Sequence, residues 1–280
     1  PTALTLPTKD RWRQRSGEML ARYDHTLDGD QQIQILVSHH STEKVSRNVS
    51  VSPTSDDRTI DKSGMRESIL RAVYRRHDGD LSLSAGAEGA INILNSRNAL
   101  YTDGMAVALP AANVRVEEKR GEGFIDGTWR ASPTVTAELE MRYETSVLSQ
   151  SGDSNLTKPL SYAKPRFQTI WRPTPKQELR FVVERQVGQL NFDDFVSSAN
   201  LVNDNVKAGN RDLVPDRTTR IELTWERRFW DRGSLTVTAQ RDNVTALVDH
   251  VPVFDNGTVL DAMGNIGDGQ RDQLRANLTM

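Results

Sequence analysis

Residues 134–144 read TVTAELEMRYE, and this stretch decides the fold class of the chain. Its odd-numbered positions, from Val135 to Tyr143, are apolar, and its even-numbered positions, from Thr134 to Glu144, are polar or charged. Successive side chains of a β-strand point to opposite faces, so a repeat of two sorts the residues between those faces. The stretch is therefore predicted to be a strand with one apolar and one polar face.

The same alternation recurs along the chain, most clearly at residues 81–88, 220–226, 235–239 and 274–280, and more weakly at 33–37 and 179–183. No stretch shows convincing helical spacing, so we predict an all-β protein with about eleven strands. The predicted strands are 11–27, 31–40, 65–77, 80–93, 113–130, 134–147, 160–172, 177–189, 217–229, 233–248 and 270–280.

The connections between these strands alternate between short and long. Turn signals at 28–30, 78–80, 131–133, 173–175 and 231–233 each join two strands as a hairpin would. Long polar stretches separate the hairpins, at 39–65, 94–112, 146–160, 188–216 and 249–269. In an antiparallel up-and-down meander, all short turns then lie at one rim and all long loops at the other. This asymmetry is typical of transmembrane outer-membrane β-barrels, and we expect the chain to form part of one.

Aromatic residues near the short turns support the same interpretation. Each hairpin carries one within a few residues of its turn, where Trp and Tyr rings form belts at a membrane interface. The alternative is that strand ends favour aromatics through β-propensity alone. The residues are Tyr23, Tyr74, Trp129, Trp171 and Phe229-Trp230.

Composition excludes several other classes of protein. The 280 residues include 36 Lys+Arg and 38 Asp+Glu, a balance that argues against nucleic acid or an anionic membrane surface as an electrostatically captured partner, since either would need a basic excess or a basic patch. Cysteine is absent, which excludes disulfides, thiolate zinc sites and a Cys nucleophile. No run approaches the roughly 18 apolar residues of a transmembrane helix, and residues 1–7 do not read as an intact secretory signal.

Residues 209–218, GNRDLVPDRT, carry a resemblance to a known family. They resemble the Gly-Asn-Pro-Asp-Leu-x-Pro-Glu-x-Ser/Thr segment in the barrels of TonB-dependent outer-membrane receptors, with Arg211 in place of the usual Pro. The preceding residues 184–195 are similar to the strand-to-loop passage of some members. Physically, Gly209 and Asn210 are expected to turn the chain through positive φ, Leu213 to anchor the loop and Pro215 to precede a strand.

The resemblance implies a barrel of about 22 strands with a plugged lumen. Residues 1–280 would then be a partial receptor barrel, from which the plug domain, the energy-coupling segment and the terminal barrel strands are absent. Residues 278–280 lack the aromatic that ends such barrels, so we expect an internal fragment.

Other constellations carry no chemistry in this interpretation, and no catalytic, cofactor-binding or metal-binding residue is assigned. His39 and His40 are adjacent on a strand and point to opposite faces, so they do not form a metal site with His25. The pairs Asp56-Asp57 and Asp193-Asp194 are expected to be solvated loop acids. Residues 120–123, RGEG, are expected to form a bulge or bend in a long strand.

The function implied by the resemblance is energy-coupled uptake of a scarce solute, such as a metal chelate, vitamin or saccharide, across the outer membrane of a Gram-negative bacterium. The partners would be a small solute at the extracellular loops, the TonB energy-transducing protein acting through the plug, and outer-membrane lipid. The protein would not be an enzyme. Two alternatives stay open: a passive porin-like channel, and a secreted or periplasmic all-β binding module or carbohydrate-active enzyme.

Overall fold

The computed structural model describes residues 8–27, 29–52, 55–109, 111–200, 205–230, 232–255 and 258–280. Within these residues the chain forms a sheet of 12 strands and a sheet of four. The large sheet comprises β1 (Thr8–Leu27), β2 (Gln31–Val51), β3 (Asp56–Asp78), β4 (Leu81–Thr102), β5 (Met105–Val107), β6 (Asn113–Ser132), β7 (Val135–Gly152), β8 (Leu156–Thr174), β9 (Gln177–Val187), β12 (Arg217–Phe229), β13 (Gly233–Thr245) and β16 (Gly269–Thr279). The small sheet comprises β10 (Ser198–Asn200), β11 (Asn205–Lys207), β14 (Val248–Asp255) and β15 (Thr258–Asn265), and a 3-10 helix, η1, spans Phe192–Phe195.

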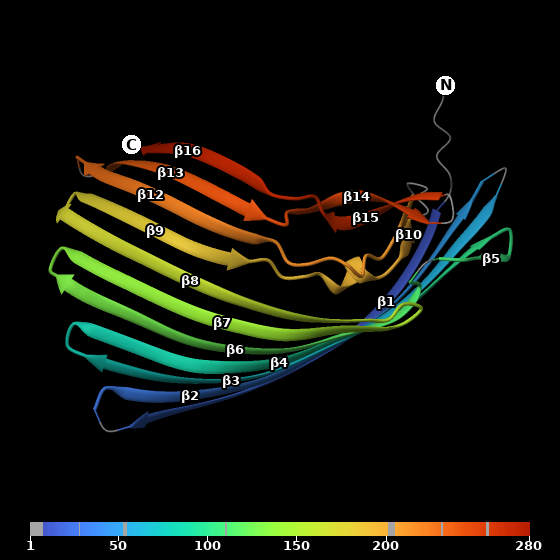
Figure 1. Cartoon of the computed structure of the whole chain (residues 1–280), viewed down its shortest axis with the longest axis horizontal. Helices are drawn as coiled ribbons and strands as arrows, with labels where there is room; N and C mark the ends of the chain where they lie inside the picture. The colour runs from blue at the N-terminus through green and yellow to red at the C-terminus, as the bar shows by residue number, and fades with distance from the viewer. Residues whose placement is uncertain are drawn as a thin grey trace.

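The large sheet is an antiparallel meander (Figure 1). Its strands lie side by side in the order β1-β2-β3-β4-β6-β7-β8-β9-β12-β13-β16, and β5 pairs with β4 off this path. Each strand in the order is antiparallel to the next, so the predicted fold class is confirmed.

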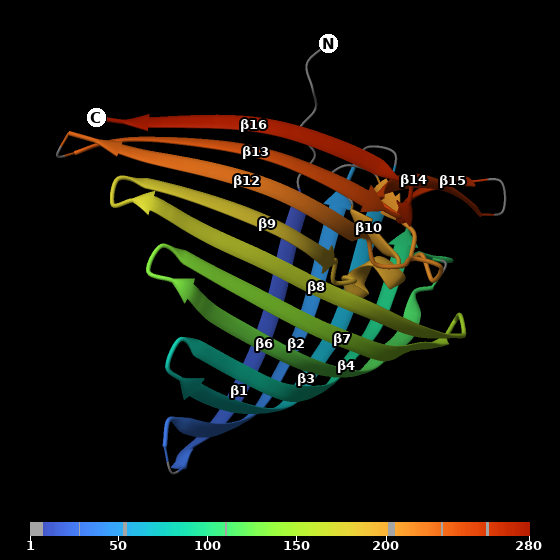
Figure 2. The ribbon, with the colours of Figure 1, turned by 60° about the vertical axis from the view of Figure 1, so that its left-hand side comes forward.

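The meander curves into an open half-pipe (Figure 2). Among the described residues, β1 pairs only with β2, and β16 pairs only with β13. Both lateral edges therefore carry backbone N–H and C=O groups that have no partner strand in the described part of the chain.

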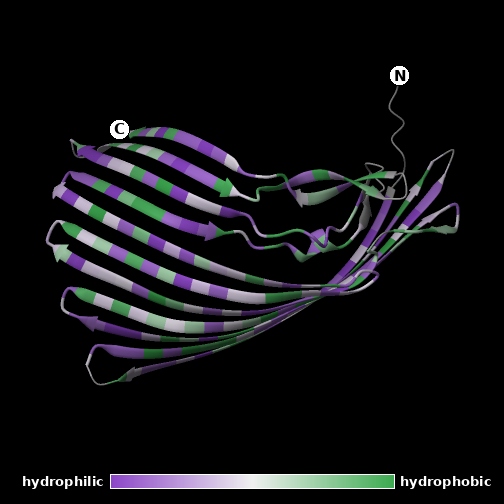
Figure 3. Cartoon of the chain, viewed as in Figure 1, coloured by the Kyte–Doolittle hydropathy of each residue, from purple (hydrophilic) through white to green (hydrophobic). Residues whose placement is uncertain are grey.

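The two faces of the half-pipe differ in polarity, as the alternating colours along each strand show (Figure 3). In β7, Leu139 and Tyr143 are 58% and 57% exposed on the convex face. Glu138 and Arg142 alternate with them and are half-buried on the concave face. Leu148, on the same concave side further along β7, is only 1% exposed because loops cover it.

Exposed apolar side chains form a continuous band on the convex face, which we call the apolar band. It is the surface that a lipid-facing wall requires, because only one residue in two along each strand contacts the lipid. Its large members are Met19, Tyr23, Ile35, Val37, Leu70, Tyr74, Leu81, Leu83, Ile91, Ile125, Trp129, Leu139, Met141, Tyr143, Val147, Phe167, Trp171, Ile221, Leu223, Leu274 and Leu278.

The short hairpin turns lie together at one rim, on the left of Figure 1, as predicted. Gly29 and Gly79 have φ values of +73° and +58°, which explains glycine at these turns. Residues 28 and 231 of the predicted turn signals lie outside the described residues. The aromatics of this rim lie on the convex face, for example Trp129 at 55% and Trp171 at 48% exposure, so they gather near the short turns as predicted.

The predicted long loops at 39–65, 94–112 and 146–160 are wrong in large part. β2 and β3 run on to residues 51 and 56, β4 runs to 102, and β7 and β8 leave only 153–155 between them. The strands continue past the apolar band, where polar and apolar residues are mixed on both faces and the sequence shows no regular alternation. Short and long connections therefore do not alternate strictly, and only 188–216 and 246–268 remain long.

These two long connections form the small sheet, in the order β10-β11-β15-β14. β11 and β15 come from different connections and pair in parallel through Lys207 and Asp261. The two connections therefore make one structural unit, which we call the inner loops. In the described part of the chain, no helix is long and apolar enough to cross a membrane.

Candidate functional site: the concave face and the inner loops

A row of alternating charges crosses the concave face, and we call it the charge ladder. It runs over six strands, β7, β8, β9, β12, β13 and β16, with each residue directly opposite the next in the strand register. Alternating signs make every step attractive, which is the arrangement that cross-strand pairs favour. The members are Glu140, Arg166, Glu184, Arg220, Asp242 and Arg271.

Distances along the charge ladder are those of ion pairs and hydrogen bonds. Arg166 Nη1 donates to Glu140 Oε1 at 3.0 Å, and its Nε lies 3.4 Å from Glu184 Oε2. Asp242 is 3% exposed at its side chain and accepts from Arg220 Nε at 2.9 Å and from Arg271 Nη2 at 2.7 Å. The ladder therefore uses its charges internally, and a solute passing the concave face would meet a nearly neutral surface there.

A second ionic cluster lies on the concave face of β4, β6, β7 and β8. Lys164 contacts both Glu122 and Glu144, which are directly opposite each other on β6 and β7. One ammonium group thus separates two carboxylates that would otherwise repel. Phe124 lies beside this cluster between two guanidinium groups, with the Cζ atoms of Arg71 and Arg142 each 4.9 Å from the ring centroid.

The inner loops pack onto the concave face through a small hydrophobic core. The core joins Leu94 of β4, Val116 of β6 and Leu148 of β7 to Phe195 and Leu213 of the loop between β9 and β12. All five side chains are at most 1% exposed. Hydrogen bonds fix the same contact, since Asn98 Nδ2 donates to the Ser197 carbonyl at 2.5 Å and Gln150 Nε2 to the Phe195 carbonyl at 3.5 Å.

The segment that carries the family resemblance forms the anchor of these loops. Asn210 Oδ1 accepts from the Asp212 amide at 2.9 Å, and its Nδ2 donates to the Met263 carbonyl at 2.9 Å, which joins the two connections. Leu213 is buried, as predicted, and Pro215 precedes β12 by two residues. Arg211 is exposed, which explains how the segment accepts Arg at that position.

Gly209 is required for a different reason from the predicted one. It is not among the glycines with positive φ, so the expected left-handed turn is wrong. A Cβ atom at this position would lie 2.3 Å from the Phe195 carbonyl oxygen. The glycine therefore permits close approach of two backbone segments.

Lys158 of β8 caps the same segment from the sheet. Its Nζ donates to the carbonyl oxygens of Arg211, Asp212 and Leu213 at 3.4, 2.9 and 3.2 Å. Burial lowers the pKa of the Lys158 ammonium, and the Asp212 carboxylate opposes that shift. No sequence pattern marks Lys158, because its partners come from a loop more than 50 residues away.

A hollow of about 370 Å³ lies between the inner loops and the concave face of β2, β3 and β4. His40, Glu67 and Asn92 line it from three neighbouring strands and occupy one row, since Glu67 is the register partner of both others. Gln189 and Asn191 line it from the loop. Asn92 is 9% exposed, and its Oδ1 atom is buried and accepts no hydrogen bond from the described residues. The hollow is therefore lined by polar side chains, and one of them, Asn92, has a buried oxygen atom that lacks a hydrogen-bond donor among the described residues.

The histidines are placed as the alternation predicts. His39 faces the convex side, where its Nδ1 lies 2.8 Å from Ser68 Oγ, whereas His40 faces the hollow and its Nε2 lies 2.9 Å from Thr42 Oγ1. His25 stacks on Tyr23 with ring centroids 6.1 Å apart. Among the described residues, no three His, Asp or Glu side chains are placed to hold a metal ion.

The predictions for the acidic pairs and for residues 120–123 need correction. Asp56 and Asp57 begin β3 and do not lie in a loop, and Asp57 accepts from Thr102 Oγ1 at 2.7 Å. Asp194 is 8% exposed and pairs with Lys207 Nζ at 2.6 Å, so it is not a solvated acid. Residues 120–123 pair with β4 and β7 without any register shift, so the expected bulge is wrong.

Comparison with known proteins places this architecture. No protein-family model matches the sequence, and no curated protein sequence matches it. Among solved structures, the ferric citrate transporter in its unliganded form has a TM-score of 0.64 and 13% identity, with 98% of this chain and 40% of that chain covered. The pyoverdine receptor of Pseudomonas aeruginosa bound to pyoverdine has a TM-score of 0.64 and 9% identity, with 96% and 42% covered. A double mutant of the Serratia marcescens hemophore receptor in complex with its hemophore and heme has a TM-score of 0.60 and 11% identity, with 95% and 52% covered.

A curved antiparallel meander with an apolar convex face, a charged concave face and an aromatic belt at the short turns defines the outer-membrane β-barrel class. Within that class, the chain has the fold of the barrel wall of TonB-dependent outer-membrane receptors. The resemblance noted at residues 209–218 is thereby confirmed at the level of the fold. The chain spans 40–52% of the length of the three solved chains it was compared with.

Proposed function

We propose that the chain forms part of the barrel wall of an outer-membrane receptor that takes up a scarce solute in a Gram-negative bacterium. Energy for uptake would come from the inner membrane through a TonB-type energy-transducing protein. The observation that carries this proposal is that both long connections fold inward and cover the concave face. A wall whose loops fold into its own lumen can hold a solute there, as in barrels that are plugged by loops, whereas the lumen of a porin is a water-filled channel.

We further propose that residues 1–280 are one section of a larger wall. The two lateral edges, β1 and β16, support this, because an open edge in hydrocarbon leaves backbone groups unpaired at several kcal/mol each. Further strands would close the wall. A plug inside the lumen would contact the charged concave face and link the receptor to its energy-transducing partner.

The solute class is a metal chelate, a vitamin or a saccharide. The names of the compared proteins include heme, ferric citrate and pyoverdine as their own ligands. On this chain, the hollow lined by His40, Glu67 and Asn92 is the surface we assign to solute contact. Its unpartnered Asn92 Oδ1 would accept a hydrogen bond from a hydroxyl or N–H group of the solute. The receptor would bind and release the solute without covalent chemistry.

Uptake measured in cells that express the full-length protein tests the proposal. Cells would be offered labelled ferric chelates, cobalamin and oligosaccharides, with and without a protonophore that collapses the inner-membrane gradient. Uptake of one solute that stops with the protonophore is expected. Flux that continues unchanged after the gradient collapses would instead identify a passive channel.

The hollow has its own matched variants. Asn92→Leu removes the acceptor that lacks a partner, and Glu67→Gln removes its charged neighbour; both should weaken solute binding. Asn95→Leu, on the opposite face of the same strand, is the control and should bind as the unaltered protein does. Equal binding by all three variants would remove the hollow from the solute path.

A further inference from the structure

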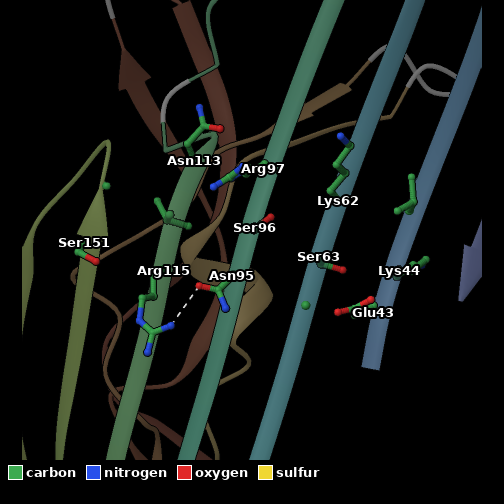
Figure 4. A pocket seen from close by; sticks show the side chains of 14 residues that line it. Glu43, Lys44, Lys62, Ser63, Asn95, Ser96, Arg97, Asn113, Arg115 and Ser151 are labelled. Carbon is green, nitrogen blue, oxygen red and sulfur yellow. Dashed lines mark hydrogen bonds between the residues drawn. The ribbon is translucent and has the colours of Figure 1, made fainter. Parts of the chain in front are cut away.

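The convex face carries an open hollow of about 550 Å³ beyond the apolar band, where β2, β3, β4, β6 and β7 lie side by side (Figure 4). Arg97 and Arg115 line it from β4 and β6. Ser96 and Val114, which alternate with them, are buried at 5% and 3% exposure. Arg97 and Arg115 therefore lie on the outside of the half-pipe, on the face opposite the inner loops.

Two cations on neighbouring strands line this hollow without an ion-pair partner among the described residues. Lys62 on β3 is the register partner of Arg97 on β4, and both side chains are exposed. Neither side chain makes an ion pair or a hydrogen bond with any described residue. Like charges directly opposite in an antiparallel pair repel and destabilise the sheet. The arrangement is one that a bound anion would stabilise.

Neighbouring side chains complete a site for an oxyanion. Arg115 is held in place by two bonds, since its Nη1 donates to Asn95 Oδ1 at 3.2 Å and its Nη2 to Glu117 Oε2 at 2.6 Å. Figure 4 shows Asn95 beside Arg115, Arg97 pointing from β4 toward Asn113 on β6, and Lys62 on β3, on the other side of β4. Guanidinium, ammonium and amide donors together match the several oxygens of a phosphoryl group.

The height of the site above the apolar band indicates that the phosphoryl group belongs to a membrane lipid. On β4, Arg97 lies four residues beyond Ile93, which is the last large apolar convex residue before it. Four residues rise about 13 Å along a strand, or about 10 Å along the membrane normal at the usual barrel tilt. Long cationic side chains also extend toward the interface. The site is thus level with the lipid head groups and lies on the side of the wall that faces them.

Some other charges on this face are neutralised within the chain. Arg241 Nε donates to Asp272 Oδ1 at 2.7 Å on β13 and β16. Lys119 pairs with Glu117 at 3.1 Å. Neither Lys62 nor Arg97 forms such a pair with a described residue, although the Glu43 carboxylate lines the same hollow from β2.

We propose that Lys62 and Arg97, with Arg115 and Asn95, bind the phosphorylated head group of a lipid in the outer leaflet beside the barrel. The inference rests on the outer-membrane placement given under Proposed function. It is independent of the solute, because the site and the solute hollow lie on opposite faces of the same strands.

Titration of the purified full-length protein with diphosphoryl lipid A, followed by native mass spectrometry, tests the proposal. The variant Lys62→Gln/Arg97→Gln should weaken lipid A binding by about tenfold or more, because it removes both charge-assisted contacts. The control Arg76→Gln/Arg227→Gln removes the same charge from the same face at the short-turn rim and should bind as the unaltered protein does. Inorganic phosphate at millimolar concentration should not displace the lipid.

Thermal unfolding in vesicles gives a second readout. In pure phosphatidylcholine, Lys62→Gln/Arg97→Gln should be at least as stable as the unaltered protein, since it removes a repulsion. Added lipid A should raise the unfolding temperature of the unaltered protein only. Undiminished lipid A binding by the double variant, or full competition by phosphate, would overturn the inference. Heat-modifiable gel mobility separates the two proposals: a protein that never inserts contradicts the proposed function, whereas an inserted protein that ignores lipid A contradicts only this inference.

Discussion

Arg220 on β12 lies directly opposite Asp242 on β13, and its Nε donates to Asp242 Oδ1 across 2.9 Å. The same carboxylate accepts from Arg271 on β16 at 2.7 Å, so one buried acid joins three strands of the charge ladder. The strands it joins are the last three of the meander, where β16 has a partner on one side only among the described residues.

Asp242→Ala should therefore lower the free energy of unfolding by about 2–3 kcal/mol, because it leaves two guanidinium groups without their acceptor. Urea unfolding of the full-length protein in lipid vesicles measures the loss. Asp272→Ala is the control. Both side chains of its pair with Arg241 are more than half exposed, and such pairs contribute little to stability. Equal losses for the two variants would show that burial of Asp242 contributes nothing.

Leu139→Arg should destabilise the protein by about 2–4 kcal/mol, because it places a charge in the apolar band near the bilayer midplane. Glu140→Gln, the next residue on the same strand, faces the concave side and should be much milder. Assembly into the outer membrane, followed by heat-modifiable gel mobility, compares the two. Equal tolerance of both changes would contradict the assignment of the faces.

Gly209→Ala should loosen the inner loops, since the added Cβ would lie 2.3 Å from the Phe195 carbonyl oxygen and the backbone must move. Faster cleavage within residues 188–216 by an added protease is the expected result. Gly121→Ala is the matched change, because a Cβ there meets nothing within 4 Å. Cleavage at the same rate in both variants would mean that the inner loops do not depend on this close approach.

Asp61 of β3 lies nine residues beyond Leu70, outside the apolar band. Burial raises the pKa of its carboxyl group above 3.8, and a hydrogen bond from Thr59 and the charge of Lys44 oppose that shift. Between 3.8 and that raised value the folded protein binds more protons than the unfolded chain, so this group makes stability fall as pH rises through the window. Asp61→Asn should remove that fall. As pH rises from 3.8, the variant Asp61→Asn should become progressively more stable than the unaltered protein, as measured by the free energy of unfolding. The difference should level off once pH exceeds the raised pKa of Asp61. A difference that shrinks with rising pH would contradict the burial of this carboxyl group.

The strands and their faces could be predicted from the sequence because a lipid-facing wall imposes an alternation of period two. Leu139 and Glu140 show this directly, since Leu139 belongs to the apolar band and its neighbour Glu140 belongs to the charge ladder. The aromatic belt at Trp129 and Trp171 was predictable for the same reason, because the bilayer fixes the height of amphipathic rings. The strand extensions at 41–51 and 94–102 were not, since beyond the apolar band polar and apolar residues are mixed on both faces and the alternation disappears; Leu94, for example, is buried beneath the inner loops.

The inner loops and the sites could be predicted only in part. Leu213 could be recognised as an anchor because an isolated apolar residue in a polar loop needs a buried position. Two features could not be predicted: the hydrogen-bond partners of Lys158, and the row formed by His40, Glu67 and Asn92. Both depend on which strands are neighbours and on the register in which neighbouring strands pair. That information belongs to the register of the sheet, and local sequence does not contain it.

The charge ladder has a consequence for how the wall assembles. A slip of one residue between neighbouring strands would exchange the two faces, so hydrophobicity alone prevents it. A slip of two residues restores the faces and costs almost nothing in burial, which makes it the error a meander of this kind is most exposed to. After such a slip Arg166 would meet Val182 or Gln186 in place of Glu184, and Asp242 would meet Gly269 or Gln273 in place of Arg271. All four replacement residues are uncharged. At these two steps the ion pairs of the ladder therefore favour the native strand alignment over a two-residue slip, which burial of apolar side chains alone does not exclude.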